Sequence, residues 1–173
     1  MEDKVVQLKD EVLSLLVQIA DHEGDNIRKA ANIICDAMVQ ERRVHILGTG
    51  AHSQIAVEEV LWRAGGLAAW NPIIDPGTSL VHGAKRSVSF ERAEGYGISV
   101  LNANAVGSTP EEVMVIVNAY GIDPMSIDVA LECRKRKVTT IGVTSPAYGR
   151  MISAESPIRH SSRKNLFEEV DVF

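Results

Sequence analysis

Along the first forty residues, apolar side chains recur at every third or fourth position, which is the period of an α-helix. Over residues 2–20 these positions form one stripe, made of Val5, Leu8, Val12, Leu15, Leu16 and Ile19. Over residues 23–40 a second stripe follows, made of Ile27, Ala30, Ala31, Ile34 and Met38. The pattern therefore predicts two successive amphipathic helices.

After residue 40, short β-rich runs alternate with helical segments. Strands are predicted in RRVHILGTG (42–50), LAAWNPIIDPG (67–77), Val113–Val117 and VTTIGVTS (138–145). Helices are predicted in SQIAVEEVLWRAGG (53–66), SFERAEG (89–95) and SIDVALECRKRK (126–137). SSRKNLFEEVDVF (161–173) predicts a helix that enters one more strand, and LNANAVGSTPEE (101–112) predicts a loop. Such alternation predicts an α/β fold with parallel strands in a doubly wound sheet.

Ligands of a doubly wound sheet bind beyond the carboxyl ends of its strands. Three predicted loops lie there, at residues 48–53, 118–121 and 144–145. The first combines glycines with Thr49, His52 and Ser53, and a predicted helix follows. That combination suits an anion, because glycines let a ligand approach the backbone and the N–H groups of a helix start point outward. Ser53 has a second interpretation as the N-cap of that helix, which would contribute about 1 kcal/mol.

Composition and motifs exclude several classes of partner. The first loop has Ser53 where a dinucleotide fingerprint has its third glycine, and no Gly-Lys-Ser/Thr of a P-loop follows. The net charge of −5, with no basic stripe, argues against nucleic acid. Apolar runs stay below the roughly 18 residues of a membrane span. The histidines lack metal-ligand spacing, so we predict no metal and no cofactor. Cys35 and Cys133 are interpreted as reduced thiols of a cytoplasmic protein.

Six stretches, taken together and in order, resemble the sugar isomerase (SIS) domain family, and in particular a phosphoheptose isomerase-like subgroup of bacterial proteins. They are VHILGTGAHSQIAVEEVLWRAGGL, NPIIDPG, VHGA, FERAEG, IGVTS and RHSSRKNLFEEVDVF. The likeness runs from about residue 5 to the end. It implies a three-layer αβα sandwich, flavodoxin-like, around a five-stranded parallel sheet. The chain is then a single domain over residues 1–173, with a helical pair (1–40) and an α/β core (41–173).

The resemblance further implies a sugar-phosphate ligand and a homodimer or homotetramer with sites shared between subunits. Family members continue beyond the residues that match NLFEEVDVF, so the C-terminal end is expected to be truncated. No nucleic acid or membrane partner is expected. Hydroxyl groups and glycines of the strand-end loops would hold the ligand. In this sequence they are Gly48, Thr49, Gly50, His52 and Ser53 in the first loop, and Thr144 and Ser145 in the third.

The second loop departs from the family pattern. Where SIS domains commonly have Ser-x-Ser-Gly, this chain has Asn118, Ala119, Tyr120 and Gly121. Asn118 is expected to donate from its amide, and Tyr120 to close the pocket or stack on a sugar. The sequence therefore leaves open whether the ligand carries a phosphate.

Aldose–ketose isomerisation moves a proton between neighbouring carbons through an enediol, so it needs an acid/base group at the substrate. In phosphoheptose isomerases, a glutamate of the helix after the first loop has this role. The matching residues are Glu58 and Glu59. Adjacent helical residues point about 100° apart, so only one of them can face a given pocket. Glu59 is also placed to pair with Arg63 on the surface.

Other candidates remain beside these glutamates. His82 and His160 are further acid/base candidates, and Ser161 and Ser162 either cap the following helix or reach a ligand. Glu91 either pairs locally with Arg92 or enters a site. The leading hypothesis is a sugar-phosphate isomerase. The alternatives are a non-catalytic sugar-phosphate-sensing subunit and another sugar enzyme on the same scaffold.

Overall fold

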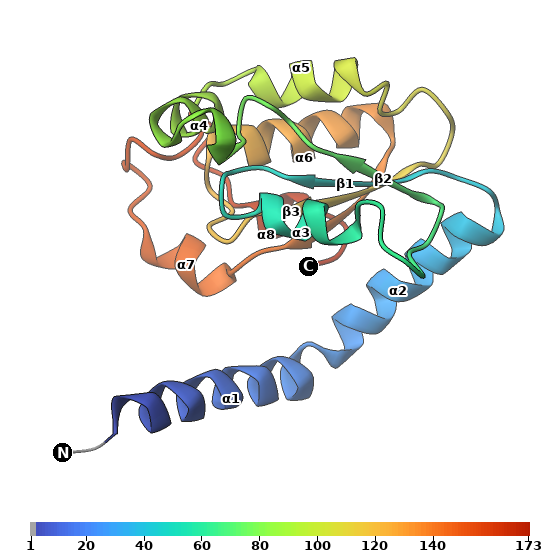
Figure 1. Cartoon of the computed structure of the whole chain (residues 1–173). Helices are drawn as coiled ribbons and strands as arrows, with labels where there is room; N and C mark the ends of the chain where they lie inside the picture. Colours follow the sequence, from blue (N-terminus) through green and yellow to red (C-terminus); the bar gives the residue numbers. More distant parts are fainter. Residues whose placement is uncertain (1–2) are drawn as a thin grey trace.

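Four parallel strands form the sheet of this computed structural model, which describes residues 3–173. Their order is β2-β1-β3-β4, with β1 at Val44–Gly48, β2 at Trp70–Ile73, β3 at Val113–Val117 and β4 at Thr139–Val143. The chain steps outward from β1 in both directions, as a doubly wound sheet requires. Because all the strands are parallel, their carboxyl ends lie at one edge of the sheet (Figure 1).

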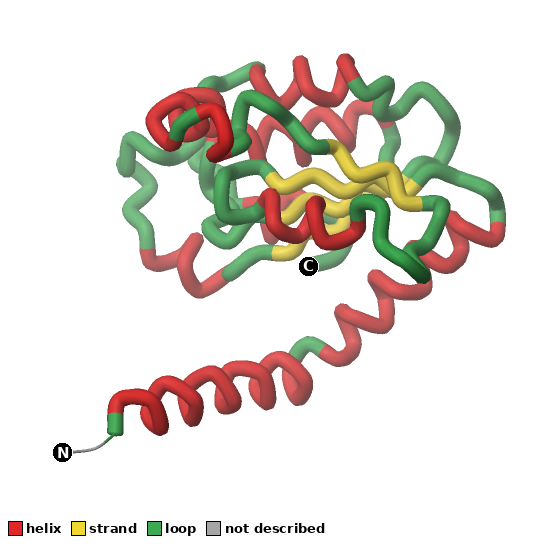
Figure 2. The backbone as a smooth tube through the Cα atoms, in the orientation of Figure 1, coloured by secondary structure: helices red, strands yellow, loops and turns green. Residues whose placement is uncertain are grey.

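Helices cover both faces of the sheet (Figure 2). One face packs against α2 (Gly24–Val39) and α3 (Gln54–Val60). The other packs against α5 (Tyr96–Ala103), α6 (Pro124–Arg136) and α8 (Leu166–Glu169). The remaining short helices are η1 (Leu80–His82), α4 (Ala84–Glu91) and α7 (Pro146–Met151).

Strand β3 shows why both faces need cover. Successive side chains of a strand point to opposite faces. Met114 and Ile116 enter the core beneath α5 and α6, whereas Val113 and Val115 enter the core beneath α2 and α3. A strand that is apolar at every position is therefore buried from both sides, as parallel sheets generally are.

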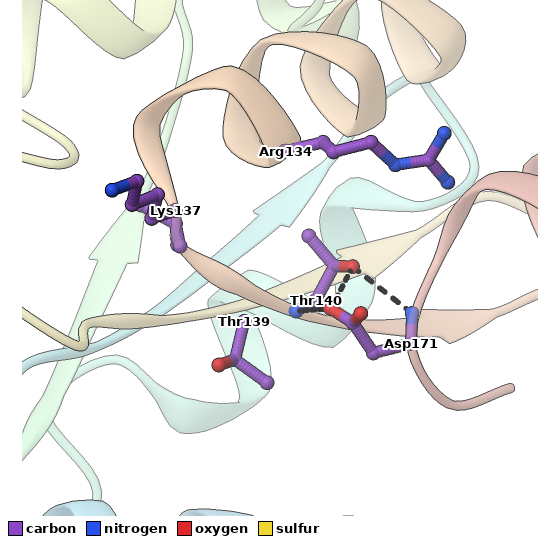
Figure 3. A pocket seen from close by; sticks show the side chains of 6 residues that line it. Arg134, Lys137, Thr139, Thr140 and Asp171 are labelled. Atoms are coloured by element: carbon purple, nitrogen blue, oxygen red, sulfur yellow. Dashed lines mark hydrogen bonds between the residues drawn. The ribbon is translucent and has the colours of Figure 1, made fainter.

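The expected fifth strand does not form, because residues 170–173 make a single parallel bridge, between Val172 and Ile141. The preceding residue explains the difference. The Asp171 carboxylate accepts hydrogen bonds from the Thr140 backbone N–H and hydroxyl, each at 2.8 Å (Figure 3). A side chain thus takes the place of a ladder bond on β4, and regular pairing is confined to one residue.

Two predicted helices differ in extent. The helix expected over residues 53–66 ends at Val60, because Leu61 is extended and Trp62 has a φ of 53°. The helix expected at 89–95 is α4, which begins at Ala84 and ends at Glu91. The segment 101–112 is a loop only after Ala103, where α5 ends.

Helix α1 (Lys4–His22) projects away from the sheet (Figure 1). Asp3 caps its first turn, and none of its residues is buried. The predicted stripe is open to solvent, with Val5 74%, Leu8 66% and Leu15 51% exposed. Within residues 3–173, none of the helices combines the length and apolar character that crossing a bilayer requires. Nothing within residues 3–173 covers the stripe, and the expected homo-oligomer stays a prediction.

We expect the double substitution Leu8→Asp and Leu15→Asp to lower the molar mass in solution, because it places charges in the middle of the exposed stripe. Sedimentation velocity at micromolar concentration measures this. The control is Gln7→Glu with Gln18→Glu, which adds the same charge at exposed polar positions of the same helix. A wild-type chain that sediments as a monomer would contradict the expectation.

Candidate functional site

The carboxyl edge of the sheet brings the three predicted loops together around two neighbouring hollows. The first, here called the Glu91 hollow, is lined by Gly50, Ala51, His52, Ser53, Glu91, Asn118, Ala119 and Tyr120. The second, called the Thr144 hollow, is lined by His52, Ser53, Ile55, Val117, Ala119, Val143, Thr144 and Ser145. His52, Ser53 and Ala119 belong to both, so the hollows are neighbours that share a wall; the Glu91 hollow has a volume of only about 10 Å³, against about 310 Å³ for the Thr144 hollow.

The first loop folds back so tightly that two of its positions require glycine. A Cβ on Gly48 would lie 2.3 Å from the Ser53 carbonyl oxygen, a clash with backbone that cannot relax by a rotamer change. A Cβ on Gly50 would lie 2.9 Å from Glu91 Oε2. The glycines therefore serve close approach of protein groups, and Gly50 lets a carboxylate reach the loop.

Asn118 connects the first loop to the second. Its amide nitrogen donates to the Thr49 carbonyl oxygen at 2.9 Å and to the Thr49 hydroxyl at 3.1 Å. Its amide oxygen accepts from the backbone N–H groups of Tyr120 and Gly121, at 2.9 and 2.7 Å. Both amide hydrogens are thus used inside the protein, and Asn118 and Thr49 are buried. These two residues therefore position the loops, and their expected contact with a ligand stays a prediction.

The hydroxyl groups of the site differ in how they are bound. Ser53 stands at the N-cap of α3 but makes no side-chain capping bond, whereas Ser145 caps α7 by accepting from Tyr148 N–H at 3.3 Å. The Thr144 hydroxyl is buried without a hydrogen-bond partner among the residues described. Gly121 passes beside it with a φ of 61°. Among the described residues, other protein groups therefore use neither hydroxyl, although the Thr144 oxygen itself is buried.

Aromatic rings cover this edge. The His52 and Tyr120 rings meet edge to face at 6.4 Å, and Tyr120 packs against Tyr148 at 4.8 Å. Tyr120 comes from the second loop, where the family pattern has a hydroxyl residue. Where that pattern has a small hydrogen-bond donor, this chain therefore has the ring of Tyr120, which borders the Glu91 hollow.

Glu91 is the residue whose place in the site the sequence did not decide. It ends α4, and its half-buried carboxylate faces the first loop. Burial raises the pKa of Glu91, and the Arg92 charge and a hydrogen bond to the Ala51 backbone oppose this only in part. A carboxyl group with a raised pKa in a strand-end hollow has the properties of an acid/base group.

A second carboxyl group lies in the electrostatic field of the first. Asp123 caps α6, accepting from the Ser126 N–H at 3.0 Å and from the Ser126 hydroxyl at 2.9 Å. Burial raises the pKa of Asp123 to about 7, and the negative charge of Glu91 contributes to the rise. Asp123 lines neither hollow, so it is a buried carboxyl group close enough to Glu91 to feel its charge, and the charged forms of both groups are disfavoured.

Gln54 was missed by the sequence analysis. It is buried in the first turn of α3, where its amide donates to the Gly48 carbonyl oxygen at 2.9 Å and to the Thr78 hydroxyl at 2.8 Å. Thr78 in turn binds Asp75, which also accepts from the Tyr96 hydroxyl at 2.8 Å. Its position directly after the glycine loop was the signal in the sequence that could have identified it. Gln54 joins the first loop to the segment after β2.

The predicted acid/base residues lie elsewhere on the chain. Glu58 and Glu59 are exposed on α3, and Glu59 pairs with Arg63 at 2.5 Å. His82 is exposed in η1. These residues line neither hollow within residues 3–173, and their catalytic roles stay predictions.

The segment with His160, Ser161 and Ser162 also lies outside both hollows. The His160 ring packs beside α6, facing Asp128, and Ser161 binds Glu94. Arg159 is buried and donates to Asn165 and to carbonyl groups near α7, including that of Ile152 at 2.8 Å. Arg159 therefore connects this segment to the segment around α7.

Comparison with known proteins identifies the family. A model described as SIS domain matches residues 7–145. The chain belongs to the SIS domain family. UPF0309 proteins of Geobacillus kaustophilus and Geobacillus thermodenitrificans are each 36% identical, over 89% and 99% of this chain. The chain spans 59% and 65% of the length of these two relatives.

A solved phosphoheptose isomerase from Francisella tularensis has the same fold, with a TM-score of 0.62 over 87% of this chain and 79% of that chain. Sequence identity to it is 14%, so the likeness concerns the fold. The resemblance inferred from the six sequence stretches is confirmed at the level of the SIS family.

We expect Asp123→Asn to stabilise the protein at pH 8 more than at pH 5. In the wild type the folded pKa is about 7 against an ordinary value of 3.8, so the unfolded chain releases this proton first as the pH rises. The free energy of unfolding therefore falls between pH 3.8 and about pH 7, by at most about 1.4 kcal/mol per pH unit. Above pH 7 it stays at the lower value. Asparagine caps helices as well as aspartate and carries no charge.

Urea unfolding at pH 5, 6, 7 and 8 measures the difference between variant and wild type. Asp36→Asn, at an exposed position of α2, is the matched control and should show no such trend. A constant difference for Asp123→Asn across this range would show that the carboxyl group is ionised throughout.

Proposed function

We propose that this SIS domain binds a sugar phosphate, or a related sugar derivative, across the two hollows and interconverts its aldose and ketose forms. Family membership supports the ligand class. The observation that carries the reaction is the Glu91 carboxylate, held against the first loop with a raised pKa. The relatives are longer than this chain, so the proposal concerns the site that these residues build.

The Thr144 hollow suits the anionic end of the ligand. Ser53, Thr144 and Ser145 line it, and the Thr144 hydroxyl, although buried, has no other partner among the described residues. The second loop contributes less, because the Asn118 amide is fully used and Tyr120 provides a ring. The first and third loops would then hold the phosphate, and His52 would lie between it and the carbon chain.

Glu91 would act as the acid/base group. Its carboxylate takes the proton from the carbon beside the carbonyl group and returns it to the neighbouring carbon, which passes the sugar through an enediol. His52 lines the same hollow and would donate a hydrogen bond to the oxygen that gains negative charge. Tyr120 would stack on the sugar or close the hollow.

Glu58, Glu59, His82 and His160 are the competing acid/base candidates from the sequence. Each would require a pocket other than the two hollows, for example one completed by a second subunit. Substitution therefore separates the two proposals.

We expect Glu91→Gln to retain ligand binding and to lower turnover at least about a hundredfold, because it keeps the shape of the hollow and removes the base. Thermal shift against a panel of sugar phosphates identifies a ligand. Proton NMR in D2O then measures exchange at the carbon beside the carbonyl group, which needs no knowledge of the product.

Glu58→Gln and Glu59→Gln are the matched controls, because both positions are exposed on α3. Loss of exchange in either of them, with Glu91→Gln unaffected, would assign the base to α3. Stabilisation by a dinucleotide and by no sugar phosphate would contradict the ligand class. Binding without any exchange in the wild type would identify a sugar-sensing subunit.

A further inference from the structure

Two adjacent serines between α7 and α8 face different partners. Ser161 donates its N–H and its hydroxyl to the Glu94 carboxylate, at 2.7 and 2.9 Å. The Ser162 backbone N–H donates to His160 Nδ1 at 2.9 Å, and the Ser162 hydroxyl is hydrogen-bonded to the same nitrogen at 2.7 Å. Both serines are exposed. One hydroxyl therefore meets a carboxylate and the other meets an imidazole nitrogen.

The hydrogen bonds define the tautomer of His160. A backbone N–H can only donate, so Nδ1 must be the unprotonated nitrogen, and the proton of the neutral ring is on Nε2. Nε2 lies 3.3 Å from Asp128 Oδ1, and the other Asp128 oxygen accepts from the Gly95 N–H at 2.5 Å. The imidazole is thus oriented by a carboxylate on one nitrogen and can receive a proton on the other.

The two supporting side chains are buried and the serine is exposed, as nucleophilic catalysis requires. The side chains of Asp128 and His160 are only 8% and 10% exposed, whereas Ser162 faces solvent. The His160 backbone is also fixed, since its N–H donates to the Ile122 carbonyl oxygen at 3.0 Å and its carbonyl oxygen accepts from the Arg163 N–H at 2.8 Å. A reactive hydroxyl must be accessible while its base is held in place.

We propose that Ser162 is a reactive serine, activated by His160 and oriented through Asp128, that accepts acyl groups from small esters. The roles are those of a Ser-His-Asp triad, which is defined by geometry and not by sequence order. Here Nδ1 receives the serine proton and Nε2 faces the carboxylate. The site is separate from the sugar site, because none of the three residues lines either hollow.

The chemical steps balance without a cofactor. Ser162 Oγ attacks the ester carbonyl carbon while His160 Nδ1 takes the hydroxyl proton. The tetrahedral intermediate collapses, and the leaving alkoxide takes that proton and departs as an alcohol. Water, deprotonated by His160, then hydrolyses the acyl-serine to a carboxylic acid and regenerates the hydroxyl. Asp128 keeps the ring oriented and carries no group in transfer.

The test uses a fluorophosphonate probe on the folded chain of residues 1–173, with peptide mapping of the labelled residue, and initial rates with 4-nitrophenyl acetate. The wild type should be labelled at Ser162. Ser162→Ala should lose the label and at least about tenfold of the esterase rate, and His160→Gln should do the same. Ser161→Ala is the matched control and should keep both.

Asp128 is a positioning residue, so Asp128→Asn needs a readout beyond activity. Its labelling rate should fall, and kcat for 4-nitrophenyl acetate should fall while KM stays near the wild-type value, because the substitution misorients the ring and leaves the surface that meets the ester unchanged. Melting temperatures of all variants identify any that fail to fold, and exposed Ser162→Ala is the variant on which the conclusion depends. An unlabelled wild type, or equal labelling of wild type and Ser162→Ala, would mean that the contacts only hold a turn together.

Discussion

One buried amide holds the carboxyl edge of the sheet together. The first and second loops leave neighbouring strands, and Asn118 joins them by filling its donors with Thr49 and its acceptor with two N–H groups of its own loop. A buried polar group costs free energy unless it is paired, and here all pairs are made. The positions of His52 and Tyr120, and so the walls of both hollows, follow from this arrangement.

Much of the fold was predictable because the spacing of apolar residues along the chain indicates which side chains are buried. The four strands and the main helices follow from apolar positions that the sheet buries on two faces. The failures lie where a side chain competes with the backbone or the chain changes direction. Asp171 bonding to Thr140 limits the last strand to a bridge, and the positive φ of Trp62 accompanies the early end of α3. Neither event leaves a periodic signal.

The site was predictable in its loops and less so in its chemistry. The ends of parallel strands converge whatever their side chains, so the hollows lie where the strand order requires. Which carboxylate reaches them depends on contacts between segments far apart in the chain. Glu91 arrives from α4 because Gly50 leaves room for it, and Gln54 ties the loop to the segment after β2. Such contacts are properties of the packed structure.

The two serines between α7 and α8 have a consequence for comparing related chains. Chemically identical neighbours differ here only in what the rest of the fold puts opposite them, a surface carboxylate or an anchored imidazole. An alignment that scores residue types would rate the positions as equivalent. The reactivity of Ser162 depends on Asp128, which lies in α6. A relative that keeps both serines would therefore lose the chemistry through a single substitution in that helix.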